Sequence, residues 1–385
     1  MQNFGPKNLL VDFMEITVLT SAHFRYDVRI YHKELVSLKK KYNSVKLIVL
    51  DGKGNEFTKD GIEIIDLNWK RKSVSRLNRF TLFQFWIVKH FRKGNNLIHF
   101  HDSECFLSMV ILKVFFKQNF IYDIHENLVE DIKSKTYIPK LFRRFLSFGT
   151  RIVENYIVSK ASGVITATPY LSSKFVGLNR NVESIINYPE LEIFKNCSKY
   201  NSREKKNVVY VGVINEIRGV FEVMDSIDNF PRDLRFSVAG PFTSDKVRNT
   251  FFSHRNIERV DYLGVIGRSQ IHELLNNSLC GVLTGYPVKN ALDSLPIKLY
   301  EYLACGLPVV ISDYPKWREF IESYKVGYTV DCFNTKEVSK RITEVITNRE
   351  KSKQMSRSGR LLFETKFNWE DQEDKLFKFY ENIIE

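Results

Sequence analysis

The chain has 385 residues, more than one hydrophobic core usually holds. Of these residues 43% are hydrophobic and 27% are charged, which is typical of soluble globular proteins. Its net charge is +13, and residues 1–200 account for almost all of it, with 31 Lys and Arg against 19 Asp and Glu. No apolar run reaches the roughly 18 residues that span a bilayer, and five scattered cysteines without a CxxC pair argue against zinc fingers and disulfide scaffolds, so we expect a cytoplasmic protein with reduced thiols.

The first half of the chain alternates short apolar segments with longer amphipathic ones. The apolar segments, which are typical of buried parallel strands, are residues 14–20, 45–51, 62–67, 96–102, 120–126 and 163–168. Residues 27–42 and 141–161 are amphipathic and long enough for helices. Because strands and helices alternate, we expect right-handed βαβ units and a doubly wound parallel sheet in a first domain, residues 1–195.

Polar residues stand where several of these predicted strands end. A turn with His23 follows the first strand, and His101 and Asp102 end the fourth. His125 ends the fifth. Ligands of open α/β sheets bind beyond the carboxyl ends of the strands, so these residues are candidates for a site. The alternatives are a backbone-bonded histidine at position 125 and, for His101 and Asp102, the floor of a cleft.

A polar stretch, residues 196–207, predicts a linker, after which the alternation starts again. The strand-like segments that follow are VVYVG, RFSVAGPF, VDYLGVI, LCGVLTG, LPVVISD and VGYTVD. We place the second domain at residues 196–365 and expect residues 366–385 to form a helix that packs back on the first domain. The chain is therefore predicted to be α/β, with two doubly wound Rossmann-like domains.

The stretch YVGVINEIRGVFEVMDSI leads from a strand through a loop between Gly212 and Gly219 into a helix. Arg218 stands where this helix begins, which is an unfavourable place for a cation unless an anion binds there. A solvated loop arginine is the alternative. The loop is a weak signal alone and a stronger one beside a second cation.

That second cation is Lys298, in the stretch LPIKLYEYLACGLPVVISD of residues 295–313. Ser294 is a plausible N-cap of a helix here, and Pro296 suits its first turn. Lys298 and Glu301 lie three residues apart and share a face. Free N–H groups and Lys298 can face a diphosphate, and Glu301 can accept hydrogen bonds from two ribose hydroxyls, which suits a sugar nucleotide. A surface ion pair is the alternative, although the apolar neighbours leave little exposed face.

The order YVGxIxxxRG, AGPF, YLGVIGRSQIHELL, SLPIKLYEYLACGLPVVISD, WREFIE and VGYTVD resembles the second domain of GT-B-fold glycosyltransferases of family 4. In the first half, TSAHFRYDVRIYHKELVSL and YDIHE resemble a bacterial branch of that family whose members build surface polysaccharides. The resemblance covers nearly the whole chain. It implies a GT-B architecture with two domains facing a central cleft. It also implies retaining transfer of a sugar from a nucleotide sugar to a saccharide or lipid-linked saccharide acceptor.

For the donor, the resemblance implies that Glu301 holds the nucleotide ribose and that Asp293 contacts the donor sugar. Asp293 stands where the family usually has glutamate, and Val213 stands where it usually has an arginine that binds the diphosphate. The diphosphate is therefore left to the remaining cations. The implied donor-binding residues are Gly212, Arg218, Leu295, Pro296, Lys298 and Glu301.

For the acceptor, the resemblance is less specific, because SAHFRYD stands where the family usually has a Gly-Gly loop after the first strand. The possible acceptor contacts are His23, Asp27, Arg29, His101 and Asp102. His125 matches a histidine that lies beside the donor sugar in relatives. Catalytic roles are therefore implied for His125, Asp293 and Arg218.

The chain contains no Asp-x-Asp pair, the usual carboxylate arrangement for a metal on a nucleotide diphosphate. We therefore expect Arg218, Lys298 and a helix N-terminus to stabilise the leaving group, with no metal and no other cofactor. A double displacement would need two carboxylates flanking the sugar, and the sequence offers no convincing nucleophile. A front-face route, in which the leaving phosphate takes the acceptor proton, fits these residues better.

Two other functions remain open. A GT-B-fold sugar-nucleotide epimerase would need further acid–base groups near the donor, and only Asp102, His125 and Glu126 are available. A non-catalytic nucleotide-sugar-binding protein is suggested by Val213 and Asp293, which depart from the family pattern. Assays of donor turnover separate these functions from a transferase.

Residues 69–93 and 140–160 interleave Lys and Arg with Phe, Trp and Leu, which is typical of helices at an anionic membrane surface. The alternative is that the aromatic residues face the core and the basic ones face solvent. No recognised nucleic-acid module is present, so we expect no nucleic-acid partner. The expected location is the cytoplasm, including the inner face of the cell membrane.

Overall fold

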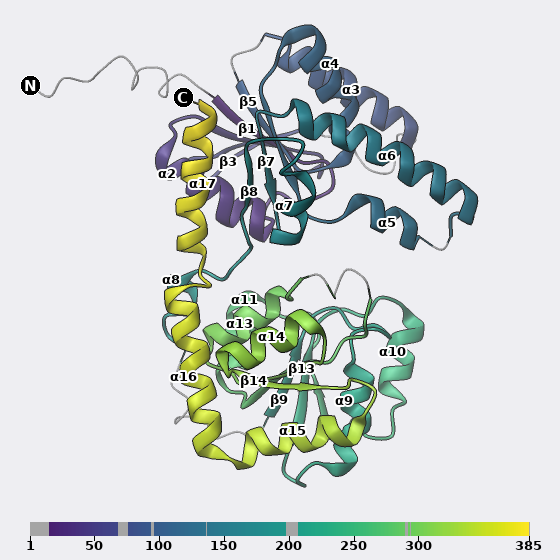
Figure 1. Ribbon diagram of the computed structural model, residues 1–385, viewed down its shortest axis with the longest axis vertical. Helices are drawn as coiled ribbons and strands as arrows, with labels where there is room; N and C mark the ends of the chain where they lie inside the picture. The colour runs from purple at the N-terminus through teal and green to yellow at the C-terminus, as the bar shows by residue number, and fades with distance from the viewer. Residues whose placement is uncertain are drawn as a thin grey trace, which may run out of the picture. The chain divides into compact units, whose positions relative to one another are not determined.

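Figure 1 shows the computed structural model of the protein, which describes residues 15–67, 76–93, 96–135, 137–197, 207–288, 292 and 294–384. The chain divides into two compact units, Met1–Asn187 with Gln372–Glu385, and Tyr188–Asp371. The sequence suggested a boundary after residue 195 and a return to the first domain at residue 366. The first of these boundaries lies earlier in the structure, because Tyr188 packs on Tyr300 and Phe367 of the second unit, with ring centroids 4.5 and 5.4 Å apart.

The first unit is built on an eight-stranded sheet with the order β3-β4-β2-β1-β5-β6-β7-β8. The strands are β1 (Glu15–Leu19), β2 (Val45–Val49), β3 (Glu56–Phe57), β4 (Glu63–Asp66), β5 (Asn96–Phe100), β6 (Phe120–Ile124), β7 (Gly163–Thr166) and β8 (Val182–Ser184). The pairs are parallel except β3 with β4. The six strands predicted for this half are present, and the short strands β3 and β8 were not predicted.

Helices cover the sheet of the first unit. They are η1 (Val28–Leu35), α2 (Val36–Lys41), α3 (Arg76–Phe91), η2 (Ser103–Cys105), α4 (Phe106–Phe116), α5 (Leu128–Ser134), α6 (Lys140–Lys160), α7 (Pro169–Phe175) and most of α17 (Trp369–Ile384). The predicted helix over residues 27–42 begins as η1, a π-helix whose wider hydrogen bonds include His32 N–H to Asp27 O at 3.2 Å. Among the described residues, no helix is long and apolar enough to cross a membrane.

The second unit has a six-stranded parallel sheet with the order β11-β10-β9-β12-β13-β14. The strands are β9 (Asn207–Val211), β10 (Arg235–Ala239), β11 (Val260–Tyr262), β12 (Cys280–Leu283), β13 (Val309–Ser312) and β14 (Gly327–Val330). The helices are α8 (Leu191–Phe194), α9 (Val220–Ser226), η4 (Ile227–Asn229), α10 (Asp245–Phe252), η5 (Ile257–Arg259), α11 (Arg268–Asn276), α13 (Ile297–Ala304), α14 (Pro315–Tyr324), α15 (Thr335–Thr347) and α16 (Arg349–Thr365). All six strands predicted for this half are present.

The strands are apolar on both faces because helices cover both sides of each sheet. Phe100 and Phe120 are fully buried in the first unit, as are Phe236 and Val310 in the second. Among the parallel strands of each sheet the chain order reverses once, between β1 and β5 in the first and between β9 and β12 in the second. The carboxyl ends of these strand pairs are where open α/β sheets bind ligands.

Candidate functional site

In the second unit, Lys298 lies directly over Gly212, the first residue after β9. A Cβ built on Gly212 would overlap Lys298 Cε and lie 2.6 Å from Nζ, and the φ of Gly212 is +149°, so only glycine suits this position. Lys298 is half-buried, and burial together with the nearby charge of Arg218 lowers the pKa of Lys298. A bound anion would stabilise the charged form of Lys298 against both its burial and the repulsion from Arg218, so this site favours an anionic ligand.

Helix α13, which carries Lys298 and Glu301, is anchored on the sheet by Tyr302. Val211 N–H donates to Tyr302 Oη at 3.2 Å, and the Tyr302 ring fills the space beside Gly281 on β12. Glu301 is half-buried one turn after Lys298. The helix thus holds both predicted donor-binding side chains on a rigid support near the end of β9.

The start of α13 differs from the prediction. Pro296 occupies the N-cap position and Ile297 is the first helical residue, so the predicted cap at Ser294 is wrong. Ser294 lies in a bend whose carbonyl accepts a hydrogen bond from Trp317 Nε1–H at 2.9 Å, and this bend delays the helix. Leu295 and Pro296 are half-buried in the turn, and Asp293 lies outside the described residues.

The loop that carries Arg218 crosses from the end of β9 to the end of β12. A Cβ on Gly219, whose φ is +74°, would overlap the carbonyl oxygen of Thr284, and Thr284 Oγ1 donates to Gly219 O at 3.0 Å. Tyr286 N–H donates to Ile217 O at 2.8 Å. This fastening brings the exposed Arg218 close enough to Lys298 for their charges to interact.

Within the described ranges, neither the Arg218 nor the Lys298 side chain has a hydrogen-bond or ion-pair partner, and the nearby charge of Glu301 offsets the effects on the pKa of Lys298 only in part. The side chain of Val213 is apolar and 40% exposed, so position 213 offers no charge to a ligand. The carbonyl of Val213 accepts a hydrogen bond from Tyr210 Oη at 2.8 Å. The structure therefore brings together Gly212, Arg218, Lys298 and Glu301 at the reversal point of the second sheet.

In the first unit, Asp102 organises the reversal point between β1 and β5. Its Oδ2 accepts from Thr20 Oγ1–H and Ser21 N–H, both at 2.7 Å, and from Ala22 N–H at 3.3 Å. His23 Nδ1 lies 3.3 Å from Asp102 Oδ1. The hydrogen bond to Asp102 raises the pKa of His23. Burial alone would raise the pKa of the Asp102 carboxyl, but its hydrogen bonds hold this pKa well below its usual range.

His125, at the end of β6, lies beside this turn. Its ring centroid is 5.1 Å from that of His23 and 5.1 Å from that of His101. The side chain of His125 is 21% exposed, whereas that of His101 is fully buried. The structure thus groups His23, Asp102 and His125 at the carboxyl ends of the central strands of the first sheet, and His101 is buried beside them.

Asp27 and Arg29 have structural roles. Asp27 caps η1 by accepting from Arg29 N–H at 2.8 Å and Ile30 N–H at 3.0 Å. Arg29 is only 5% exposed, and its Nη1–H donates to the carbonyl of Ile185 at 2.6 Å. Its guanidinium also forms ion pairs inside the unit, described below. We therefore do not include these two residues among the proposed acceptor contacts.

The sequence reasoning missed three residues that surround His101. One ligand atom each of Glu34, His99, His101 and Asp123 lies within 4.8 Å of the others, and all four residues are buried. The signal was present, because side chains two apart on a strand point to the same face. His99 on β5 and His101 just after it, and Asp123 on β6 and His125 just after it, follow this spacing along neighbouring strands.

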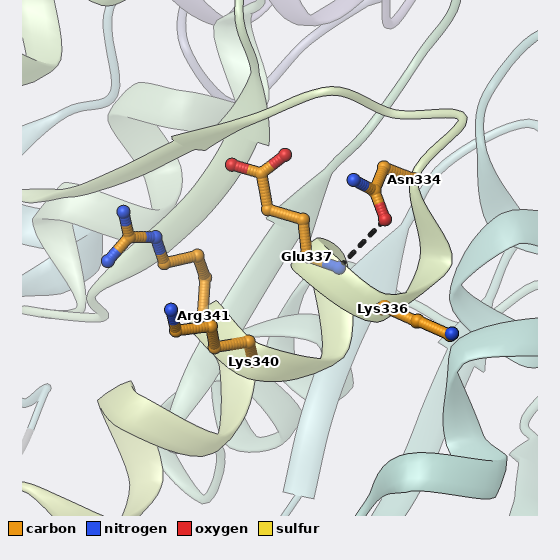
Figure 2. Close-up of a pocket in the computed structure, with 5 residues that line it drawn as sticks. All are labelled: Asn334, Lys336, Glu337, Lys340 and Arg341. Carbon is orange, nitrogen blue, oxygen red and sulfur yellow. Dashed lines mark hydrogen bonds between the residues drawn. The ribbon is translucent and has the colours of Figure 1, made fainter.

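A separate pocket of about 380 Å³ lies at the start of α15. Figure 2 shows the five residues that line it, which are Asn334, Lys336, Glu337, Lys340 and Arg341. Asn334 caps the helix by accepting from Glu337 N–H at 3.2 Å, and Arg341 pairs with Glu344 at 2.9 Å. This pocket follows the edge strand β14 and contains none of the predicted site residues.

Residues 193–362 match the family described as glycosyl transferases group 1. This match covers most of the second unit, Tyr188–Asp371. Among curated proteins, the chain is similar to spore coat protein SA of Bacillus subtilis strain 168, with 24% identity over 191 residues, 46% of this chain and 49% of the relative. An uncharacterized glycosyltransferase, MJ1178 of Methanocaldococcus jannaschii, is 22% identical over 232 residues, 59% of this chain and 62% of the relative. These matches thus span about half to three-fifths of the relatives' lengths.

Solved structures resemble the whole chain. Sucrose-phosphate synthase from Thermosynechococcus elongatus superposes with a TM-score of 0.75 at 14% identity, covering 96% of this chain and 99% of the other. HepE of Anabaena in complex with UDP-glucose gives a TM-score of 0.69 at 13% identity, covering 95% and 99%. At this identity the likeness shows the fold, and the predicted GT-B fold is confirmed.

Proposed function

We propose that the protein is a glycosyltransferase that moves a sugar from a nucleotide-sugar donor to a saccharide or lipid-linked saccharide acceptor in cell-surface polysaccharide synthesis. The observation that carries this proposal is the pair of cations, Arg218 and Lys298, beside Gly212 at the reversal point of the second sheet. The similarity of the chain to HepE, which was solved with UDP-glucose, supports a nucleotide sugar as the donor.

The donor site follows from the chemistry of these side chains. Arg218 and the half-buried Lys298 bind the diphosphate, and the low local dielectric strengthens their hold on the charge that develops as it leaves. Glu301 accepts hydrogen bonds from vicinal ribose hydroxyls. Two cations supply this stabilisation without a metal, so we expect transfer to continue in EDTA, and activity restored only by added magnesium or manganese would contradict this part of the proposal.

We assign the acceptor to the first unit, at His23, Asp102 and His125. Asp102 holds His23 by one ring nitrogen, and His125 presents a partly exposed ring beside it. The reaction proceeds with retention of configuration, as in family 4, by the front-face route. The ring nitrogens of His23 and His125 at this edge can form hydrogen bonds with sugar hydroxyls.

The first experiment is a thermal-shift screen of nucleoside diphosphates, because a ligand that binds only the folded state raises the unfolding midpoint. The second follows the loss of each matching nucleotide sugar with and without saccharide acceptors. Release of the nucleoside diphosphate with a new glycosidic bond supports the proposal. Interconversion of the sugar on the intact nucleotide would identify an epimerase, and binding without turnover of any donor would identify a binding protein.

We further propose that the first unit docks on the inner leaflet of the cell membrane, where it reaches a lipid-linked acceptor. Helix α6 exposes an unusual number of large apolar side chains, including Phe142 at 69% and Phe145 at 68%. The others on α6 are Leu141, Leu146, Phe148, Ile152, Val153 and Tyr156. At 100° per residue they form one continuous stripe, opposite the buried Glu154 and Val158. We call this stripe the apolar face of α6.

The surroundings of this face favour a lipid surface as its occupant. Lys140, Arg144 and Arg151 line one flank of the stripe and are exposed. The adjacent helices α3 and α4 add exposed Phe85 and Phe115, and Figure 1 shows all three helices together in the first unit. Contiguous exposed apolar surface flanked by basic residues matches the interface of an anionic bilayer.

A further inference from the structure

The buried cluster behind His125 centres on the carboxylate of Asp123. Arg29 clamps this carboxylate with Nε–H at 3.1 Å and Nη2–H at 3.0 Å from Oδ2, and Nη2 also lies 3.1 Å from Oδ1. The same guanidinium has its Nε 2.9 Å from Glu34 Oε1. Burial alone would raise the pKa of Asp123, but the charge of Arg29 outweighs it and keeps the group ionised. Asp123 is therefore a fixed anion inside the unit.

Two histidines meet the same oxygen of this anion. Asp123 Oδ2 lies 3.3 Å from His125 Nε2 and 3.3 Å from His101 Nδ1, and the two nitrogens lie 3.1 Å apart. An ionised carboxylate only accepts, and two facing N–H groups at 3.1 Å would repel, so one of these two ring nitrogens carries the shared proton and the other does not. We assign the proton to His125 Nε2, because His101 can carry its own proton on Nε2, which faces Glu34 Oε2 at 4.0 Å. His101 Nδ1 then accepts from His125.

The other ring nitrogen of His125 is left for a ligand. In the described part of the chain nothing is hydrogen-bonded to His125 Nδ1, and this side chain alone of the cluster is partly exposed. Burial lowers the pKa of His101, which keeps that ring neutral and able to accept. Carboxylates commonly select the tautomer of a functional histidine in this way.

We propose that Asp123, clamped by Arg29, is a positioning residue that fixes His125 with its proton on Nε2 and leaves Nδ1 to accept a substrate hydroxyl. This inference rests on the proposed function for the role of His125, but its structural part concerns the free protein. The buried charges of Arg29 and Asp123 then serve to hold the partly exposed ring of His125 in one tautomer.

A buried metal is the competing interpretation, because Glu34, His99, His101 and Asp123 have suitable atoms within 4.8 Å. The position of Arg29 argues against it. The guanidinium lies 2.9 Å from Glu34 and 3.0 Å from Asp123, so a divalent ion placed between these carboxyl groups would meet a fixed positive charge at close range. The hydrogen-bonded part of the cluster is Asp123 with His101 and His125, whereas the cluster-facing atoms of Glu34 and His99 form no hydrogen bond with any described residue. We therefore treat Asp123, His101 and His125 as one hydrogen-bonded group held by Arg29.

The direct test is nitrogen NMR of the full chain labelled at its eight histidines. His125→Gln removes one ring and so assigns the His125 resonances. At pH 7.5 we expect a protonated Nε2 and an unprotonated Nδ1 in the wild type. A protonated Nδ1, or rapid exchange between both tautomers, would overturn the proposal. This measurement needs no substrate, so it stands even if the proposed transferase activity is not found.

The functional test compares Asp123→Asn with Glu34→Gln. Both changes remove a buried carboxylate beside Arg29, but only Asp123 contacts His125. We expect Asp123→Asn to mix the His125 tautomers and to lower kcat by about 100-fold with donor KM within about threefold. Glu34→Gln should leave the tautomer and kcat nearly unchanged, because burial raises the pKa of Glu34 well above its usual value and the variant keeps a neutral side chain there.

Three outcomes of these experiments would contradict the inference. An equal loss of kcat in Glu34→Gln would mean that the cluster acts only through the fold. A donor KM that rises as kcat falls would place Asp123 in binding. A stoichiometric metal in the purified protein that is lost in His99→Gln would show that these atoms are ligands. If Asp123→Asn does not fold, the wild-type NMR result decides.

Discussion

Lys298 occupies the space that any side chain at position 212 would need. The first residue after β9 and the second residue of α13 are thus fitted to each other, although 86 positions separate them. The fit gives the lysine one orientation beside Arg218. It also allows the donor site to be tested without removing any charge.

The change Gly212→Ala tests this fit. The added methyl group overlaps Lys298 Cε and disfavours the backbone angle, so Lys298 must move. We expect nucleoside diphosphate affinity to fall about tenfold or more by calorimetry, with the circular dichroism spectrum unchanged. Gly267→Ala is the control, because its Cβ would meet only Gln270 at 3.7 Å. Unchanged affinity in Gly212→Ala would remove Lys298 from the donor site.

A double-mutant cycle tests whether Arg218 and Lys298 bind one group. Each alanine variant should weaken nucleoside diphosphate binding, and the double variant should lose less than the sum, because either cation alone leaves the same phosphate partly unpaired. Affinity measured by calorimetry for the four proteins gives the coupling. Additive losses within about 0.5 kcal/mol would place the two cations on separate groups.

Glu301→Ala should nearly abolish transfer while the protein stays folded. The half-buried carboxylate serves the ligand in our proposal, and the helix remains anchored by Tyr302. The assay is donor consumption with acceptor at saturating donor, with the unfolding midpoint as the control for folding. Glu319→Ala, an exposed glutamate on α14, is the matched variant and should be fully active. A folded Glu301→Ala protein with normal activity would refute the assignment.

Vesicle co-sedimentation tests the apolar face of α6. Each basic residue near an anionic surface contributes about 1 kcal/mol, so Lys140, Arg144 and Arg151 changed together to Gln should weaken binding on the order of 100-fold. Binding should also weaken at high salt, because the screening length is about 8 Å at physiological ionic strength. Phe142→Ser with Phe145→Ser should weaken binding at any salt. Arg71 and Lys72, also predicted to contribute, lie outside the described residues.

The control for this experiment is the pair Lys246→Gln and Arg248→Gln, exposed basic residues on α10 of the second unit. This pair should bind anionic vesicles like the wild type. Equal binding of the wild type to neutral vesicles, or none to anionic ones, would contradict the docking proposal. Self-association through the same face would instead appear as a dimer that the Phe142 and Phe145 changes dissociate.

Stability should fall as pH rises through the acid range because of Glu154. Burial raises the pKa of this carboxyl from 4.5 to about 7 in the folded protein. Between pH 4.5 and pH 7 the folded state binds one more proton than the unfolded state. Glu154 therefore leaves the free energy of unfolding unchanged below pH 4.5 and lowers it by up to about 3 kcal/mol above pH 7. Glu154→Gln should therefore raise the unfolding midpoint at pH 8, with the gain shrinking toward pH 5. A gain that grows at low pH would show the opposite sign, and exposed Glu104→Gln should show no gain.

The sequence was sufficient for the architecture because burial on both faces leaves a readable pattern. All twelve strands it indicated are present. Gly212 and Arg218 could be singled out because they follow a strand, and Lys298 and Glu301 because they are charges in an otherwise apolar helix. The Ser294 cap failed because a tertiary bond from Trp317 decides where α13 begins. Such a contact has no local signature.

The buried cluster was beyond sequence reasoning for a related reason. His101 and Asp102 are neighbours, yet Asp102 binds the turn after β1 while His101 points into the unit toward Asp123. The two directions follow from the alternation of a strand, but the partners follow from the order of strands in the sheet. Arg29, predicted as a ligand contact, became a buried counterion because Asp123 on β6 lies within its reach.

The π-helix η1 explains how Arg29 and Glu34 come to share one neighbourhood. Five residues separate them, and in an ordinary α-helix, which turns 100° per residue, their side chains would diverge by about 140°. The looser winding of η1, whose hydrogen bonds join residues five apart, turns the chain less per residue and brings position 34 back toward the side of position 29. Deleting one residue from Val28–Leu35 and restoring tighter coiling would therefore separate the arginine from one of its two counterions. The segment keeps the less favourable π-helical winding because this winding places Arg29 beside Glu34.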